Sequence, residues 1–225
     1  MSKRDGLLAL CLFALLFSVY LLTFSGIYHS SDEMSMLAAT DSLVRRGAWD
    51  IELLRWMGEQ QGSFGSDGHL YSRKGIGTTL AALPLYWAAL QSAALGNVQM
   101  AMLTNCVLTA LTGALVFLTL RRLSYGRGAS LGTALAFGLG TMAWPYARYL
   151  FSESLAGLGL LLSAYSLISY NTLPSESPPK PGADPMSIPP EDGTRVGRWP
   201  VSYTHLRAHE TVRWISYAVF GLNTL

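Results

Sequence analysis

Two adjacent carboxylates, Asp32 and Glu33, stand just beyond the first apolar stretch of the chain. That stretch, residues 6–27, contains no charged residue and at about 1.5 Å per residue can cross a bilayer core of about 30 Å. Ionised carboxylates repel one another when they lie this close. The pair can therefore serve as a general base or a metal ligand, and acids at a membrane span are usually functional.

The same residues also predict a helix that would explain the pair without chemistry. Ser30 and Ser31 are suitable N-cap residues, and the helix dipole favours acids in the first turn. Apolar residues follow at helical spacing, and Gly47 is a suitable stop. The sequence therefore leaves a structural and a catalytic interpretation of the pair side by side. The apolar positions of this predicted helix are Met34, Leu37 and Ala38.

Two further groups of charged residues border apolar stretches. Arg73 and Lys74 precede the stretch 76–95, where a guanidinium fork and an ammonium point charge would suit a phosphate. They would equally suit the lipid interface, to which basic side chains extend. Glu153 precedes the last apolar stretch, and a carboxylate there would suit a divalent metal ion. With Ser152 as N-cap, it is also a typical first-turn acid.

Composition predicts an all-α, polytopic transmembrane protein. The chain has 225 residues, of which 50% are hydrophobic and 13% charged, a balance typical of integral membrane proteins. A net charge of +2 gives no argument for a nucleic-acid partner. Cys11 and Cys106 lie inside apolar stretches and are predicted to be small hydrophobic residues. The apolar stretches are 6–27, 76–95, 98–120, 128–145 and 155–170.

Basic residues predict the orientation of the chain, because cytoplasmic loops are rich in Lys and Arg. They place the N-terminus and residues 121–127 in the cytoplasm, which conflicts with one crossing for every apolar stretch. The conflict disappears if 76–95, interrupted by Pro84, does not cross. Residues 28–95 then lie outside, together with Glu153. The alternative is five crossings that break the charge rule. The basic residues are Lys3, Arg4, Arg121, Arg122 and Arg127.

We predict five regions along the chain. Residues 1–27 are the cytoplasmic N-terminus and first span, 28–75 a partly helical external loop, 76–170 the membrane helices, and 171–200 a Pro-rich disordered segment. The fifth region, 201–225, begins with VSYTHLRAHET. It resembles a translated reading frame of a transposase adapter used in sequencing libraries. The resemblance implies an artefact, and a natural protein that continues with another sequence.

Three motifs, in this order, resemble those of GT-C superfamily membrane glycosyltransferases. The closer likeness is to bacterial aminoarabinose transferases and protein mannosyltransferases, and it covers residues 7–170. Prolines that the family often has in its second motif are missing here, which leaves the alignment of Arg73 and Lys74 open by one position. The motifs are Ser31-Asp32-Glu33, then Asp67-Gly68-His69-Leu70-Tyr71-Ser72-Arg73-Lys74, then Trp144-Pro145-Tyr146-Ala147-Arg148 with Phe151-Ser152-Glu153.

The resemblance implies sugar transfer from a polyprenyl-phosphate donor to an acceptor at the external face of the cell membrane. Asp32, or else Glu33, would be the catalytic base. Arg73 and Lys74 would bind the donor phosphate. Glu153 would orient the acceptor or help to bind a divalent metal ion as a cofactor. The later helices of such an enzyme are missing, so we expect this fragment to be inactive.

Two other classes of function stay open. One is half of a transporter or flippase, with Asp32 and Glu153 coupling ions, and the other is a non-catalytic assembly subunit. Transporters usually place such acids at the bilayer midplane, whereas these lie at the ends of spans, which favours the enzyme.

Overall fold

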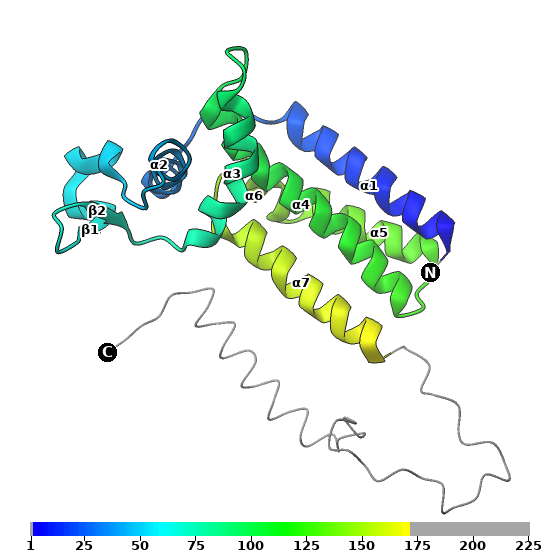
Figure 1. The fold of residues 1–225 in the computed structure, drawn as a ribbon. Helices are drawn as coiled ribbons and strands as arrows, with labels where there is room; N and C mark the ends of the chain where they lie inside the picture. The colour runs from blue at the N-terminus through cyan, green and yellow to red at the C-terminus, as the bar shows by residue number, and fades with distance from the viewer. Residues whose placement is uncertain (1, 172–225) are drawn as a thin grey trace, which may run out of the picture. The chain divides into compact units, whose positions relative to one another are not determined.

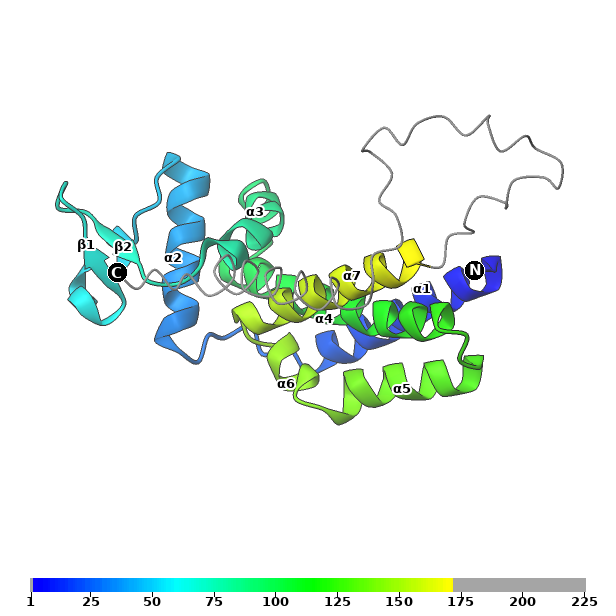
Figure 2. The same ribbon diagram turned by 90° about the horizontal axis from the view of Figure 1, so that it is seen from below.

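A computed structural model describes residues 2–171 as a mostly helical fold (Figure 1). Long helices run side by side in a bundle, and the other elements gather mainly at one end of it (Figure 2). The predicted segments 171–200 and 201–225 lie outside the described residues, apart from Asn171. The bundle consists of α1 (Lys3–Leu22), α4 (Asn97–Arg122), α5 (Arg127–Gly140) and α7 (Ser152–Asn171). The other elements are α2 (Ser31–Arg46), the 3-10 segment η1 (Glu52–Gln60), β1 (Gly62–Phe64), β2 (Leu70–Ser72), α3 (Ile76–Leu90) and α6 (Ala143–Ala147).

Small residues let the bundle helices approach closely. Leu16 of α1 is fully buried against Gly113 of α4 and Gly138 of α5, where any added Cβ would lie within 2.6 Å of a Leu16 methyl group. Tyr20, also fully buried, donates its hydroxyl to the carbonyl oxygen of Gly138 at 2.9 Å. Glycine at such contacts is typical of helices that pack in a membrane.

Two helices within residues 2–171 are long and apolar enough to cross a membrane, α1 with 20 residues and α4 with 26. Core helices of soluble proteins and signal sequences can have the same length and apolar composition. The two helices therefore fit a membrane protein but do not establish the predicted multi-pass arrangement. The apolar helix α3 has only 15 residues. It lies beside α2 and also packs against α4, at the end of the bundle (Figures 1 and 2). Whether this stretch crosses the membrane stays a prediction.

The predicted helix after the acidic pair is confirmed as α2. Ser30 is its N-cap and forms a capping box with Glu33, in which each side chain accepts a hydrogen bond from the other residue's backbone. Gly47 ends the helix with a φ of 67°, in the left-handed region that glycine adopts without strain. The local signals therefore determined both ends of this helix.

Two features differ from the predicted all-α fold. Residues 62–72 form a two-stranded antiparallel hairpin, with Phe64 opposite Leu70, and the strands are too short to show an alternating pattern in the sequence. The stretch 128–145 is not continuous, because Thr141 is extended between α5 and α6. Pro145 lies in the first turn of α6, where proline is tolerated. The helix of the last stretch begins at Ser152, three residues before the apolar run that starts at residue 155.

Candidate functional site

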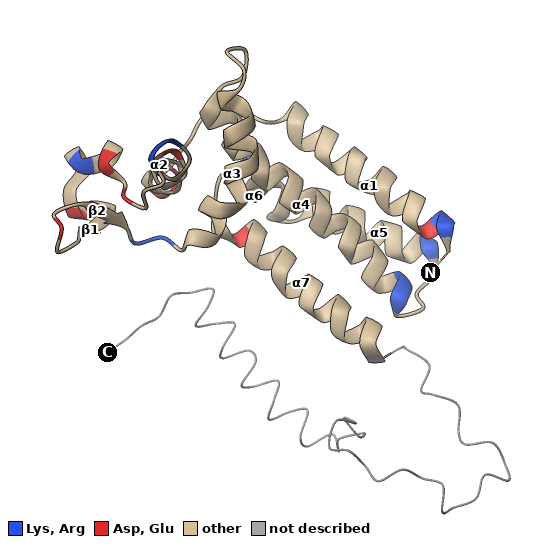
Figure 3. Cartoon of the chain, viewed as in Figure 1, with Lys and Arg blue, Asp and Glu red and all other residues tan. Residues whose placement is uncertain are grey.

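The N-terminal ends of three helices meet at one end of the bundle. Glu33 in the first turn of α2 accepts a hydrogen bond from Leu150, just before α7. Gly77 in the first turn of α3 lies against Leu155 of α7, with only 3.1 Å between an added Cβ and a Leu155 methyl group. Helix N-termini carry partial positive charge, so this end of the bundle favours anionic groups. Predicted site residues from all three motifs lie at these helix starts (Figure 3).

Asp32 and Lys74 are brought together from two of the motifs. Lys74 Nζ lies 2.7 Å from Asp32 Oδ2, and the two side chains are 37% and 42% exposed. The backbone N–H of Lys74 donates to Ser72 Oγ at 3.0 Å, and that hydroxyl is 2.7 Å from Ser35 Oγ of α2. These contacts fix the segment before α3 against α2. The site thus presents a solvent-accessible carboxylate and ammonium side by side.

Glu33 is in a different environment from its neighbour, since its side chain is fully buried. One carboxylate oxygen accepts hydrogen bonds from the backbone of His29 at 2.7 Å and of Ser30 at 2.9 Å. The other accepts from the backbone N–H of Leu150 at 2.9 Å. Both oxygens are thus engaged in joining α2 to the segment before α7. Such a carboxylate is suited to holding the site together rather than to exchanging protons with a substrate.

Asn105 holds the same segment from the side of α4, and the sequence reasoning missed it. Its side-chain amide donates to the carbonyl oxygen of Tyr149 at 2.6 Å and to that of Phe151 at 2.7 Å. Together, Asn105 and Glu33 bind one backbone group of each of three consecutive residues: the carbonyl oxygens of Tyr149 and Phe151 and the N–H of Leu150. The available signal in the sequence was an amide side chain within the apolar stretch 98–120, because polar residues there usually bind a neighbouring segment. The structure shows that Asn105 is fully buried.

Arg73 and Glu153 are less constrained than the groups described above. Arg73 is exposed and its Nε donates to Ser63 Oγ in β1 at 3.2 Å, so the two neighbouring cations have different partners. Glu153 is exposed in the first turn of α7. Within residues 2–171, no three His, Cys, Asp or Glu side chains are grouped so that they could hold a metal ion. A divalent metal at Glu153 would need ligands from a substrate or from outside these residues.

Carboxylates of the hairpin region hold the segment that carries Arg73 and Lys74. The pKa of Glu52 is lowered, first by the hydrogen bonds from Arg55 and then by the backbone N–H of Leu70. The pKa of Asp67 is lowered, first by the Tyr71 hydroxyl at 2.6 Å. These acids stay ionised at neutral pH and stabilise the hairpin.

Asp50 fastens the same region to the end of α2. Its burial raises the pKa, but the hydrogen bonds from Arg46 and from the backbone of Glu52 outweigh burial and hold it below its usual value. Ser42 donates a further hydrogen bond to this carboxylate at 3.2 Å. The hairpin is therefore tied to α2 at Asp50 as well as through Ser35.

No protein-family model, curated protein or solved structure matches this chain. The fold and the site define its class no further than a mostly helical protein, with two helices among residues 2–171 that are long and apolar enough to cross a membrane. Its function has to be argued from the residues at the end of the bundle.

Proposed function

We propose that the protein is a multi-pass membrane glycosyltransferase that takes its sugar from a polyprenyl-phosphate donor. The observation that carries the proposal is the contact between Asp32 and Lys74 at the end of an apolar bundle. Transfer with inversion from a lipid phosphate needs a base for the acceptor and a positive charge for the departing phosphate. This pair supplies both chemical groups in adjacent positions.

The distribution of charge supports a membrane location. Within the described residues, the middle of each bundle helix (α1, α4, α5 and α7) is free of Asp, Glu, Lys and Arg, and charged residues lie at the two ends of the bundle (Figure 3). Soluble proteins rarely expose as much apolar side-chain surface as α1 and α7 do. The leucines concerned are 49–66% exposed: Leu7, Leu10 and Leu15 on α1, and Leu160, Leu162 and Leu167 on α7.

The basic end of the bundle supports the orientation. Of the residues that the structure describes, five cations and one buried aspartate, Asp5, lie at the end where α1 begins and α4 stops. A cytoplasmic location of this end follows from the charge rule. The candidate site at the opposite end then lies at the outer face of the cell membrane, where lipid-linked donors would meet their acceptors.

The proposed mechanism begins with a change of partner. An exposed ion pair such as Asp32–Lys74 is typically worth about 0–1 kcal/mol, so an incoming phosphate can take over the ammonium group at little cost. Asp32 is then free to accept the proton of the acceptor as it attacks the anomeric carbon. The bond from that carbon to the phosphate oxygen breaks, and Lys74, with Arg73 nearby in sequence, stabilises the phosphate that leaves.

Glu33 and Glu153 have separate parts in this proposal. Glu33 holds the start of α2 against the segment before α7 and so positions Asp32. Glu153 is available for the acceptor or as one ligand of a divalent metal ion. No observation favours the transporter hypothesis, because the acids of the described bundle lie at its ends and not near its middle.

Replacing Asp32 with asparagine tests the proposal. The amide keeps the shape of the side chain but cannot accept a proton at neutral pH, and loss of a general base typically costs about 10²–10⁴ in rate. Sugar transfer from a polyprenyl-phosphate donor is measured in membranes of cells that express the gene as recovered by sequencing without transposase adapters. Asp41→Asn on the same helix is the matched control, since Asp41 pairs with Arg45. Transfer by Asp32→Asn at the rate of this control would refute the proposal.

A further inference from the structure

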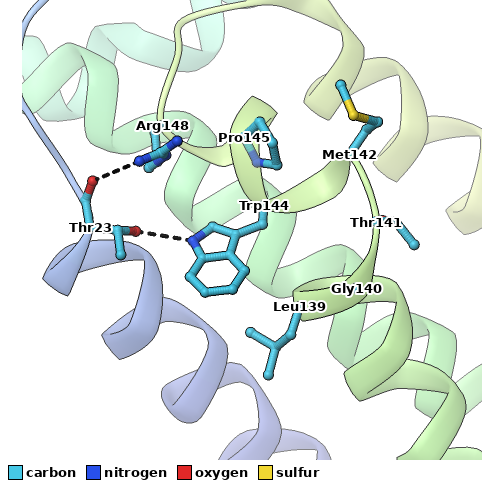
Figure 4. A pocket seen from close by; sticks show the side chains of 8 residues that line it. All are labelled: Thr23, Leu139, Gly140, Thr141, Met142, Trp144, Pro145 and Arg148. Carbon is cyan, nitrogen blue, oxygen red and sulfur yellow. Dashed lines mark hydrogen bonds between the residues drawn. The ribbon is translucent and has the colours of Figure 1, made fainter.

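A hollow of about 620 Å³ opens where α1, α5 and α6 come together (Figure 4). Sites for small molecules typically measure about 300–1,000 Å³ and have mainly apolar walls with a few polar groups. This hollow has that character, and Asp32, Lys74 and Glu153 do not line it, so it is separate from the candidate functional site. Its apolar side chains are Leu139, Met142, Trp144 and Pro145, and its polar ones are Thr23, Thr141 and Arg148.

Arg148 brings a positive charge to this hollow with hydrogen-bonding capacity to spare. One terminal nitrogen donates to the carbonyl oxygen of Thr23 at 3.3 Å (Figure 4). The Nε group is buried and has no hydrogen-bond partner, and no carboxylate pairs with Arg148 within residues 2–171. A buried donor that lacks an acceptor is costly. In the described part of the chain, the terminal nitrogens of the guanidinium make one hydrogen bond, to Thr23, so further N–H donors remain for a ligand. An anion with several oxygens, above all a phosphate, suits such donors.

The surroundings of Arg148 favour a lipid as the source of such a phosphate. Thr23 directly follows α1, so the hollow lies where an apolar helix able to cross a membrane ends. The indole N–H of Trp144 donates to Thr23 Oγ1 at 3.0 Å, and tryptophan and arginine are typical of the headgroup level. Met142 is 66% exposed in the hollow's wall. It offers apolar surface for an acyl chain next to the charged group.

We propose that this hollow binds an anionic phospholipid of the bilayer, with Arg148 holding the phosphate and Met142 and Leu139 in contact with the acyl chain. The site is independent of the proposed sugar transfer, because none of the groups assigned to that reaction lines it. Its occupant would fix the ends of α1 and α5 at the membrane surface.

Two variants test the site in the purified full chain, with binding of phosphatidylglycerol in detergent measured by native mass spectrometry. Arg148→Gln removes the charge, and we expect affinity to fall about tenfold or more, as for loss of hydrogen bonds to a charged group. Gly140→Trp fills the hollow and leaves Arg148 unchanged, because Gly140 lines it and has open space around its Cβ position. Gly132→Trp is the matched control, since Gly132 is on the same helix and equally open.

We expect Gly140→Trp to lose the lipid and Gly132→Trp to keep it. Gly140→Trp decides the matter if Arg148→Gln does not fold. Equal binding by both tryptophan variants would overturn the site.

Equal affinity for phosphatidylcholine would show that an anionic headgroup is not selected. Competition by inorganic phosphate alone would show a free-anion site, and preference for polyprenyl phosphate would show a site for the donor lipid. Each of these last three outcomes also overturns the proposal.

Discussion

A serine capping box begins a helix at each end of the bundle, but its acid binds different groups at the two ends. At one end, Ser2 caps α1 and forms a capping box with Asp5, and at the other, Ser30 caps α2 and forms one with Glu33. Both capping acids are buried, and both also reach across the fold. Asp5 binds the guanidinium groups of Arg121 and Arg127, whereas Glu33 binds the backbone before α7.

The difference lies in the residue before each capping acid. At the basic end this residue is Arg4, which adds to the cluster of cations. At the other end it is Asp32, which the cap does not need and which is 42% exposed beside Lys74. The two neighbouring acids thus have different roles. Glu33 completes the cap and joins α2 to the segment before α7, whereas Asp32 is exposed and available to react.

The largest expected effect concerns the side of the membrane on which each end lies. In a background with Cys11→Ala, Ser66→Cys would place an exposed thiol in the hairpin, and Ala129→Cys an exposed thiol at the basic end. An impermeant thiol reagent added to intact cells should label the first fully and the second only after lysis. Labelling of both positions in intact cells, or of neither, would contradict the proposed orientation.

The next effect concerns stability at the basic end. Asp5→Asn removes the negative charge that faces Arg121 and Arg127, and the Asp5 side chain is only 4% exposed. Asp32→Asn breaks one exposed pair, which is worth about 0–1 kcal/mol. We expect a clearly lower Tm for Asp5→Asn than for Asp32→Asn when thermal unfolding is followed by circular dichroism in detergent. Equal Tm values would show that the buried cluster does not stabilise the bundle.

A smaller effect is expected for the capping acid of α2. Glu33→Gln leaves one oxygen and an amide group where three backbone N–H groups need acceptors. Leaving a buried donor unsatisfied typically costs about 1–3 kcal/mol, so the free energy of unfolding should fall by that amount. Denaturant titration measures it, with Asp32→Asn as the comparison. If Glu33→Gln unfolds like the wild type but loses sugar transfer, Glu33 is the base and the assigned roles are reversed.

The smallest effect is a pH dependence confined to the hairpin. The pKa of Glu52 is lowered from 4.5 and that of Asp67 from 3.8 by partners in the folded state. Their stabilising contribution is therefore present above these values and is lost as the pH falls below them. Hydrogen-exchange protection of the Leu70 amide, corrected for the intrinsic rate, should drop in that range. In Glu52→Gln the dependence should weaken, while amides of α4 should show no change in either protein.

Features of this protein that depend on neighbours along the chain could be predicted from the residues alone. The capping box at Ser30 and Glu33 and the stop at Gly47 fix the ends of α2 through hydrogen bonds and backbone preferences within a few residues. Uncharged runs of sufficient length predict where α1 and α4 lie, although α1 ends at Leu22, before its uncharged run ends at residue 27. The clusters of basic residues could also be read directly, because charge is a property of residue type.

Which of the two adjacent acids is buried depends on contacts between distant segments, so it could be learned from the folded structure and not from the sequence. The sequence placed Asp32 and Glu33 on one helix about 100° apart, but the contact of Glu33 with Leu150 joins residues 117 positions apart. The contacts of Lys74 with Asp32 and of Asn105 with Tyr149 are of the same kind. Such contacts depend on how packed helices bring distant segments together, and no local pattern of hydrogen bonding or hydrophobicity encodes them.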